Sequence, residues 1–177
     1  MVEQRYRAFL MEHLHVQDVR HTGRSFFEHL KGTHDLLRDW GNPEFICVAG
    51  LFHSIYGTWH FRHKAFPIEQ RSALAELIGK EAEFLAYVFC VTERPKVFLE
   101  NADRPGMSVH DHFTNGDIEL SRKDLDNLLE IEAANLIEQG GNISKALQRL
   151  QTTDISAGAK AHIAMHLASA GETQRIR

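Results

Sequence analysis

The sequence predicts an all-α protein. Apolar residues recur at helical spacing in nearly every segment, helix-starting prolines and helix-ending glycines separate these segments, and no stretch shows the sustained alternation of a half-buried strand. A chain of 177 residues is long enough for one sizeable core and short for two. We therefore expect a single helical domain over residues 1–177.

The first part of the chain contains the helices around which the rest is expected to pack. An amphipathic helix is predicted over residues 2–15 and a second over 25–40, which ends at Gly41 because glycine enters the left-handed conformation at little cost. Pro43 suits the first position of a third helix, over 43–54. This helix is apolar nearly all round, which predicts that neighbours bury it on several sides.

The second part of the chain continues the helical pattern. Its predicted elements are a helix from Pro67 to Gly79, a buried helix over 80–91, an irregular region over 94–120, a long helix from a capping box at Ser121 to Gly140, and two short helices over 144–151 and 156–170. Glu81 and Glu83 are expected to be N-terminal helix charges that meet the dipole. We expect a core of about residues 17–140 with the helices of 144–170 packed on it.

Composition excludes several classes of partner. A formal charge of −4 and the lack of any Lys/Arg run give no field for nucleic acid. No apolar run approaches the length of a membrane span. Cys47 and Cys90 lie inside apolar runs, which is typical of buried thiols in a reducing compartment. We expect a cytoplasmic protein whose partner is a small, anionic molecule, and homo-oligomerisation stays open.

Two of the 12 histidines stand out because of their position. His29 and His53 each lie beside the apolar face of a helix that must be packed, and a buried imidazole needs a hydrogen-bond partner or a metal. Taken singly, each is better explained as a satisfied core histidine. Taken as a pair on adjacent antiparallel helices, they can converge on one cation. His34 lies on another helix face and is expected to be a surface residue or part of a second site.

The motifs around this pair resemble those of the HD-domain superfamily. HTGR, HLKGTH, AGLFHSIYGT, IGKEAEFLAYVFC and EAAN look most like an uncharacterised bacterial family of HD-related domains, over roughly residues 17–140. The layout is more distantly similar to the guanosine tetraphosphate (alarmone) hydrolases and to the inositol oxygenase branch. The resemblance implies an HD-like helical bundle of about eight helices.

The resemblance also implies a set of metal ligands. His29 matches the first metal histidine and His53 the histidine of the His-Asp pair, whose aspartate is replaced here by Ser54. Asn135 is the best match for the final aspartate, and Asp103 is a weaker one. Neutral Ser and Asn bind hard cations weakly, so Fe, Zn or Mn would need a further ligand, for which Glu132 or His21 is a candidate.

Further residues could contact a substrate. Arg24 could clamp a phosphate or carboxylate, or form a structural ion pair with Glu28. Ser54, Tyr56 and Thr58 follow the helix that carries His53, where their hydroxyls could reach a ligand. His60 and His63 could line an entrance but are better explained as solvated surface residues. The His110-Asp111-His112 triplet lacks a third well-spaced partner, which argues against a metal site there.

Two functional interpretations stay open. In the first, the protein is a divergent HD-type enzyme in which a metal-activated water attacks a phosphate ester or nucleotide, or, with iron, an oxygenase on the same scaffold. In the second, the missing aspartates indicate a metal-free module that binds a small molecule or regulates another protein. Convergence of a third and a fourth anionic ligand on His29 and His53, with Glu132 pointing into the site, would favour the first interpretation. Imidazoles bonded to Ser54, Asn135 or the backbone would favour the second.

Overall fold

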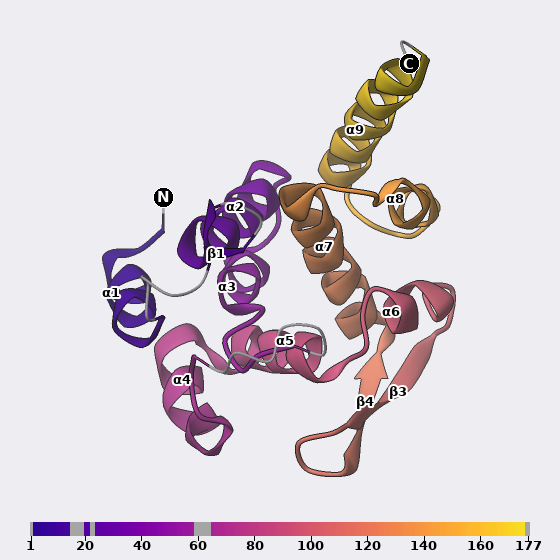
Figure 1. The fold of residues 1–177 in the computed structure, drawn as a ribbon. Coiled ribbons are helices and arrows are strands. Elements are labelled where there is room, and N and C mark those ends of the chain that lie inside the picture. Colours follow the sequence, from indigo (N-terminus) through magenta and orange to yellow (C-terminus); the bar gives the residue numbers. More distant parts are fainter. Residues whose placement is uncertain (1, 15–19, 22–23, 59–64, 176–177) are drawn as a thin grey trace.

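The computed structural model describes residues 2–14, 20–21, 24–58 and 65–175, with residues 20–21, 24–25 and 170–175 described by their backbone alone, and this part of the chain is mostly helical (Figure 1). The α-helices are α1 (Gln4–His13), α2 (Phe26–Asp39), α3 (Glu44–Phe52), α4 (Arg71–Ile78), α5 (Lys80–Val91), α6 (Lys96–Glu100), α7 (Arg122–Gln139), α8 (Ser144–Leu150) and α9 (Ala157–Arg175). A 3₁₀ turn, Ile68–Gln70, precedes α4. The strands are β1 (Arg20–His21), β2 (Arg24–Ser25), β3 (Gly106–Asp111) and β4 (Gly116–Ser121).

Helix α3 lies at the centre of the fold, as its nearly all-apolar sequence predicted. Its residues from Ile46 to Phe52 are all buried, and it packs against α2, α5 and α7. Gly50 lets α2 approach closely, because a Cβ atom here would lie 2.3 Å from Cδ1 of Leu37. The two helices that carry His29 and His53 are therefore held side by side.

Helix α7 packs against α2 and α3 and contributes a long buried segment to the core. It begins with the predicted capping box, in which the Ser121 side chain accepts from the backbone N–H of Asp124 and the Asp124 carboxylate accepts from the backbone N–H of Ser121. It ends at Gly140, whose φ is 68°. Residues 128–136 of the helix are all buried, so this segment faces the core between α2 and α3.

The prediction of an irregular region over 94–120, and with it a fold without strands, is wrong. Helix α6 and an antiparallel hairpin of β3 and β4, in register from Gly106↔Ser121 to Asp111↔Gly116, occupy this region. Met107, Val109 and Asp111 of β3 point inward in alternation. The alternation is hidden in the sequence because the third inward residue is an aspartate.

Helix α9 is longer than predicted and extends away from the body of the protein (Figure 1). Its first turns pack on the end of α2, where a Cβ atom on Gly158 would lie 2.7 Å from Cα of Trp40. Trp40 also donates from Nε1 to His162, at 2.9 Å.

The two cysteines are buried and unpaired, as predicted. Burial raises the pKa of the Cys90 thiol to about 12 and that of Cys47 to about 11. None of the helices in the described part of the chain combines the length and apolar character that crossing a bilayer requires.

Candidate metal centre

The fold brings His29 and His53 into direct contact. His29 lies in the second turn of α2, and His53 is the C-terminal cap of α3. Their Nε2 atoms are 3.2 Å apart, and the two side chains are 2% and 0% exposed. The rings meet edge to face, at an interplanar angle of 80°.

The other ring nitrogen of each histidine faces an acceptor. Nδ1 of His29 lies 2.6 Å from Oε2 of Glu138, and Nδ1 of His53 lies 2.6 Å from the carbonyl oxygen of Gly50. A carboxylate and a carbonyl only accept, so both Nδ1 atoms carry the proton. In the neutral tautomers, both Nε2 lone pairs then point at each other. This arrangement requires a proton or a cation between them.

The separation of the two Nε2 atoms fits the ligands of a single ion. Two nitrogens each about 2.1 Å from one ion lie roughly 3.0–3.5 Å apart at octahedral to tetrahedral angles. The observed 3.2 Å falls in this range. A carboxylate and a backbone carbonyl behind the imidazoles are also the usual supports of metal-binding histidines.

The environment of His53 keeps its imidazole neutral. Burial, followed by the charges of His29 and Arg94, lowers the pKa of His53 well below its usual range, although the Gly50 carbonyl and the nearby Asn135 amide act in the opposite direction. A neutral imidazole is the form that binds a metal.

Helix α7 adds Glu132 and Asn135 to this cluster, and neither side chain is exposed. Nδ2 of Asn135 donates to Oε1 of Glu132 over 3.4 Å. The Oδ1 atom of Asn135 lies near His53 but, among the residues described, has no hydrogen-bond partner. Burial raises the pKa of Glu132, although Arg94 and Asn135 partly offset this effect. Asn135 thus offers an unused oxygen beside the imidazoles.

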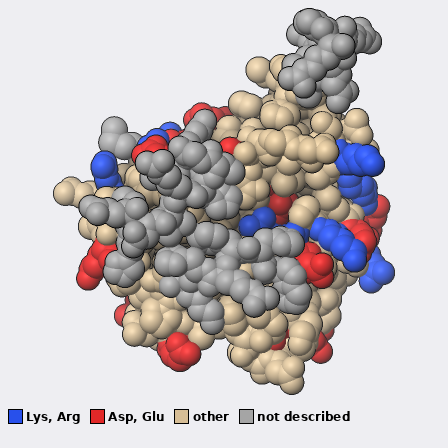
Figure 2. All heavy atoms as spheres, viewed as in Figure 1, with Lys and Arg blue, Asp and Glu red and all other residues tan. Residues whose placement is uncertain are grey.

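Arg94, just beyond α5, reaches the same cluster. Its Nη1 donates to Oε2 of Glu132 over 3.5 Å, and its guanidinium lies 4.1 Å from the ring centroid of Phe89. The His53 ring also packs on Phe89, with centroids 5.2 Å apart. Figure 2 shows basic and acidic side chains recessed near the centre of the face viewed in Figure 1, away from the basic side chains gathered on the right, beside α6 and α8.

Among the described residues, the cluster contains no third acidic or histidine side chain placed to bind an ion beside His29 and His53. Within the ranges that the structure covers, no group of three or more His, Cys, Asp or Glu side chains is placed to hold a metal ion. Glu132 faces Arg94 and Asn135, and Glu138 faces Nδ1 of His29. Two imidazole nitrogens and the Asn135 oxygen are the donors that this part of the chain provides.

The other predicted site residues divide into two groups. Ser54, Tyr56 and Thr58 are buried in the turns after α3, and the Tyr56 hydroxyl donates to Glu83 over 2.8 Å, in a different cluster from the histidine pair. Arg24 lies in β2, directly before α2, and His21 in β1, but both side chains lie outside the described part. His60 and His63 also lie outside the described residues.

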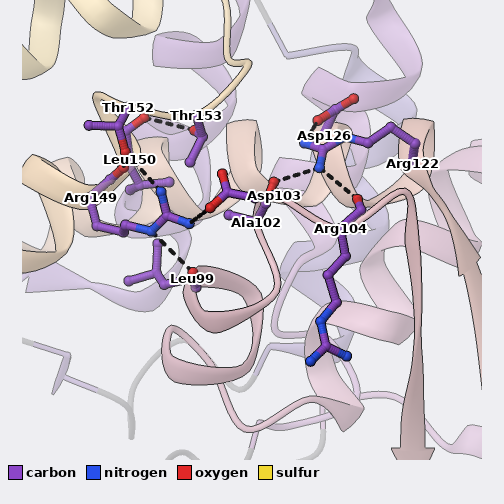
Figure 3. A network of polar contacts seen from close by, with 10 residues as sticks. All are labelled: Leu99, Ala102, Asp103, Arg104, Arg122, Asp126, Arg149, Leu150, Thr152 and Thr153. Carbon is purple, nitrogen blue, oxygen red and sulfur yellow. Dashed lines mark hydrogen bonds and ion pairs between the residues drawn. The ribbon is translucent and has the colours of Figure 1, made fainter.

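Asp103 does not belong to the cluster. Its side chain is 76% exposed and pairs with Nη2 of Arg149 at 2.6 Å. Figure 3 shows this contact beside the bonds from Arg149 to the Leu99 carbonyl and from Arg122 to the Ala102 carbonyl, which fasten α8 and the start of α7 to the end of α6. The carboxylate of Asp103 is thus structural.

The three residues of the His110-Asp111-His112 triplet, at the end of β3, have different partners and do not form one site. His110 pairs with Asp117 at the surface, while Nδ1 of His112 faces the carbonyl of Val91. Asp111 points inward and accepts from Tyr87. Of the two expectations for His34, the surface position is wrong, because the residue is 2% exposed. Its Nδ1 lies 3.0 Å from Oδ1 of Asp35.

A second buried polar cluster was missed in the sequence. Arg71 binds both oxygens of Glu83, at 2.7 and 2.9 Å, and its guanidinium lies 3.3 Å from the ring centroid of Tyr87. Tyr87 donates to Asp111 over 2.5 Å, and Tyr56 completes the cluster. Glu83 is therefore a buried partner of Arg71 and not only an N-terminal helix charge.

The structure also adds Glu138 and Arg94 to the histidine cluster. Glu138 needs Gly32 opposite it, because a Cβ atom there would lie 2.6 Å from its Cγ. Gly32 inside the HLKGTH helix was the available signal, since an interior glycine costs helix stability and suggests a close approach. Arg94 carried no comparable signal.

Comparison with family models gives a match over part of the chain. Residues 10–94 match a family described as a domain of unknown function, DUF6817. This segment includes His29, His53 and Arg94 and stops before α7, so it lacks Glu132 and Asn135. No curated protein and no solved structure matches the chain.

Proposed function

We propose that this protein is a divergent metal-dependent hydrolase of the HD type that acts on a phosphate ester or nucleotide. The observation that carries the proposal is the buried pair of Nε2 atoms, 3.2 Å apart, with both Nδ1 atoms held by acceptors. The order of the donors along the chain supports it. His29 on α2, His53 at the end of α3 and Asn135 on α7 follow the order that the HD resemblance implies.

A bound divalent ion would act as a Lewis acid and lower the pKa of a bound water. His29 and His53 would hold it through Nε2, and Asn135 through Oδ1. Glu138 and the Gly50 carbonyl already hold the imidazoles in one orientation, so the rings would not have to turn when an ion binds. Because the donors include two neutral nitrogens, zinc or iron suits the site better than magnesium.

The residues around the pair would serve the substrate. The site is shielded from water, which strengthens its electrostatic interactions. Arg24, directly before α2, remains our candidate for holding an anionic part of the substrate, and Ser54 and Thr58 remain candidates for contacts near the end of α3. Tyr56 is committed to Glu83, so we assign it no role in the reaction.

Among the described residues, no third acidic or histidine ligand joins His29 and His53, and this observation favours a metal-free alternative. If His29 is protonated on both nitrogens, it can donate to Glu138 and to Nε2 of His53, while His53 donates to Gly50. This satisfies all four ring nitrogens without an ion. The protein would then be a small-molecule-binding or regulatory module.

Metal content and phosphate release test the proposal together. We expect near-stoichiometric zinc, iron or manganese in protein purified without chelator, and release of inorganic phosphate from some members of a panel of phosphate monoesters and nucleotides. His29→Ala and His53→Ala should abolish both. His110→Ala removes a surface imidazole and should change neither.

Other outcomes would overturn the proposal. A folded protein that takes up none of these ions on soaking is the metal-free module. Bound iron with oxygen consumption and no phosphate release would indicate the oxygenase.

A further inference from the structure

Arg94 has the features of a ligand-binding residue. Its side chain is 9% exposed, and its flat face lies over Phe89, which also contacts His53. In the described part of the chain, its guanidinium has one hydrogen-bonded neighbour, Glu132, over a long 3.5 Å. A guanidinium has five N–H donors, and among the described residues this contact uses one of them.

Two buried polar atoms without a hydrogen-bond partner among the described residues belong to side chains that share a neighbour. Nε of Arg94 and Oδ1 of Asn135 are both buried without a partner among the described residues, and both side chains contact Glu132. One is a donor and the other an acceptor. A buried polar group without a partner is costly, so a buried donor and a buried acceptor that both lack a partner point to a ligand that would satisfy them.

A cation together with an oxyanion would satisfy both groups. The cation takes Oδ1 of Asn135 and the two histidine nitrogens, and the oxyanion takes the N–H groups of Arg94. We infer that Arg94 binds a phosphate group of the substrate or product, held between its guanidinium and the ion proposed at His29 and His53. A phosphate group has enough oxygens to contact an ion and the guanidinium fork at once. This inference rests on the proposed function for the ion. It adds Arg94, a residue that the sequence did not indicate, to Arg24 as a candidate for binding the anionic part of the substrate.

Binding of inorganic phosphate to the full chain tests the inference without any assay of activity. Titration calorimetry is carried out on protein with and without added metal, with acetate as the carboxylate probe. We expect phosphate to bind more tightly to the metal-loaded protein, and acetate to bind at least about tenfold more weakly than phosphate.

Substitutions at Arg94 define its role. Arg94→Gln should weaken phosphate binding by about tenfold or more, the loss of one charge-assisted contact, while metal content stays as in the wild type. Arg94→Lys keeps the charge and the pairing with Glu132 but loses the planar fork, so we expect a smaller loss. Arg149→Gln is the matched control, because it removes an arginine that pairs with exposed Asp103.

A substitution at Glu132 should act in the opposite direction. Glu132→Gln removes the carboxylate that competes for Arg94, so we expect tighter phosphate binding by severalfold. A merely structural ion pair would not produce gains and losses of opposite sign from its two partners.

The outcomes separate this inference from the proposed function. Equal phosphate binding by wild type, Arg94→Lys and Glu132→Gln would overturn the inference. Acetate that binds as well as phosphate would also overturn it, in favour of a carboxylate ligand. Arg94-dependent phosphate binding to a chain that takes up no metal would refute the metal centre and leave an anion-binding arginine.

Discussion

Two buried polar clusters, each containing an arginine and a glutamate, include a residue at or just after the end of α3, and they differ in how completely their hydrogen-bonding groups are satisfied. In the structural cluster, defined by Arg71, Glu83, Tyr56, Tyr87 and Asp111, the arginine grips both oxygens of its carboxylate and each tyrosine hydroxyl donates to an acid. Among the described residues, every buried polar side-chain atom of this cluster has a hydrogen-bond partner.

The histidine cluster, defined by His29, His53, Arg94, Glu132 and Asn135 with Glu138 behind it, is incomplete by the same measure. Among the described residues, its arginine side chain makes one long hydrogen bond, the Asn135 amide oxygen has no hydrogen-bond partner, and two imidazole nitrogens face each other. Buried polar networks stabilise a fold only when every member is satisfied. The comparison supports the proposal that one cluster holds the helices together and that the other binds a ligand.

The largest effect is expected from Arg71→Met, which leaves Glu83 buried without its cation. We expect a loss of about 3 kcal/mol in the free energy of unfolding, near the low end for such pairs because Arg71 is partly exposed. Denaturant unfolding measures it. Metal content per folded chain should be unchanged, and loss of the metal in folded protein would remove the distinction between the clusters.

Asp111→Asn should cost about 1–3 kcal/mol at neutral pH, since hydrogen bonds to the carboxylate are lost. Burial alone would raise the pKa of Asp111, but the bonds from Tyr87, Thr114 and the backbone N–H of Phe113 outweigh it and lower the pKa from 3.8. Stability from this group is therefore fully present above pH 3.8 and falls as the pH drops through the lowered pKa. Unfolding measured against pH should show the wild type approaching the variant in acid, and a constant difference at all pH values would contradict this explanation.

Glu138→Gln tests the support behind His29. The amide still accepts from Nδ1 but no longer carries charge, so metal affinity should fall by about 10–100-fold. Competition with a chromophoric chelator measures the affinity. An unchanged affinity would show that Glu138 does not orient a ligand.

The smallest effect is expected from Gly32→Ala, which changes no polar group. Its new Cβ would lie 2.6 Å from Cγ and 2.7 Å from Oε1 of Glu138 and should displace that carboxylate, lowering metal affinity by up to about tenfold. The gain in helix propensity, about 1 kcal/mol, should offset much of the strain. Gly158→Ala, which meets the Trp40 backbone, is the control that should lower stability without changing metal affinity.

The sequence predicted most of the helices because their periodicity and caps are local signals. The capping box at Ser121 and the all-apolar helix ending near His53 are examples. The hairpin was missed because Asp111 occupies an inward position. Its burial depends on Tyr87, which is distant in the chain.

The candidate site shows the same limit. His29 and His53 were recognisable because each lies on a helix that must be packed, and Asn135 because of its place in a motif. Glu138 and Arg94 depend on long-range packing, which no local pattern records. The pairing of Arg71 with Glu83 was missed for the same reason.

The most direct test of the central claim is X-ray absorption spectroscopy at the zinc edge on protein loaded with zinc. The account predicts scattering from two imidazoles together with oxygen donors, reduced to one imidazole in His53→Ala and unchanged in His110→Ala. A shell without imidazole, or one that His53→Ala leaves intact, would contradict the claim that the facing histidines form a metal centre.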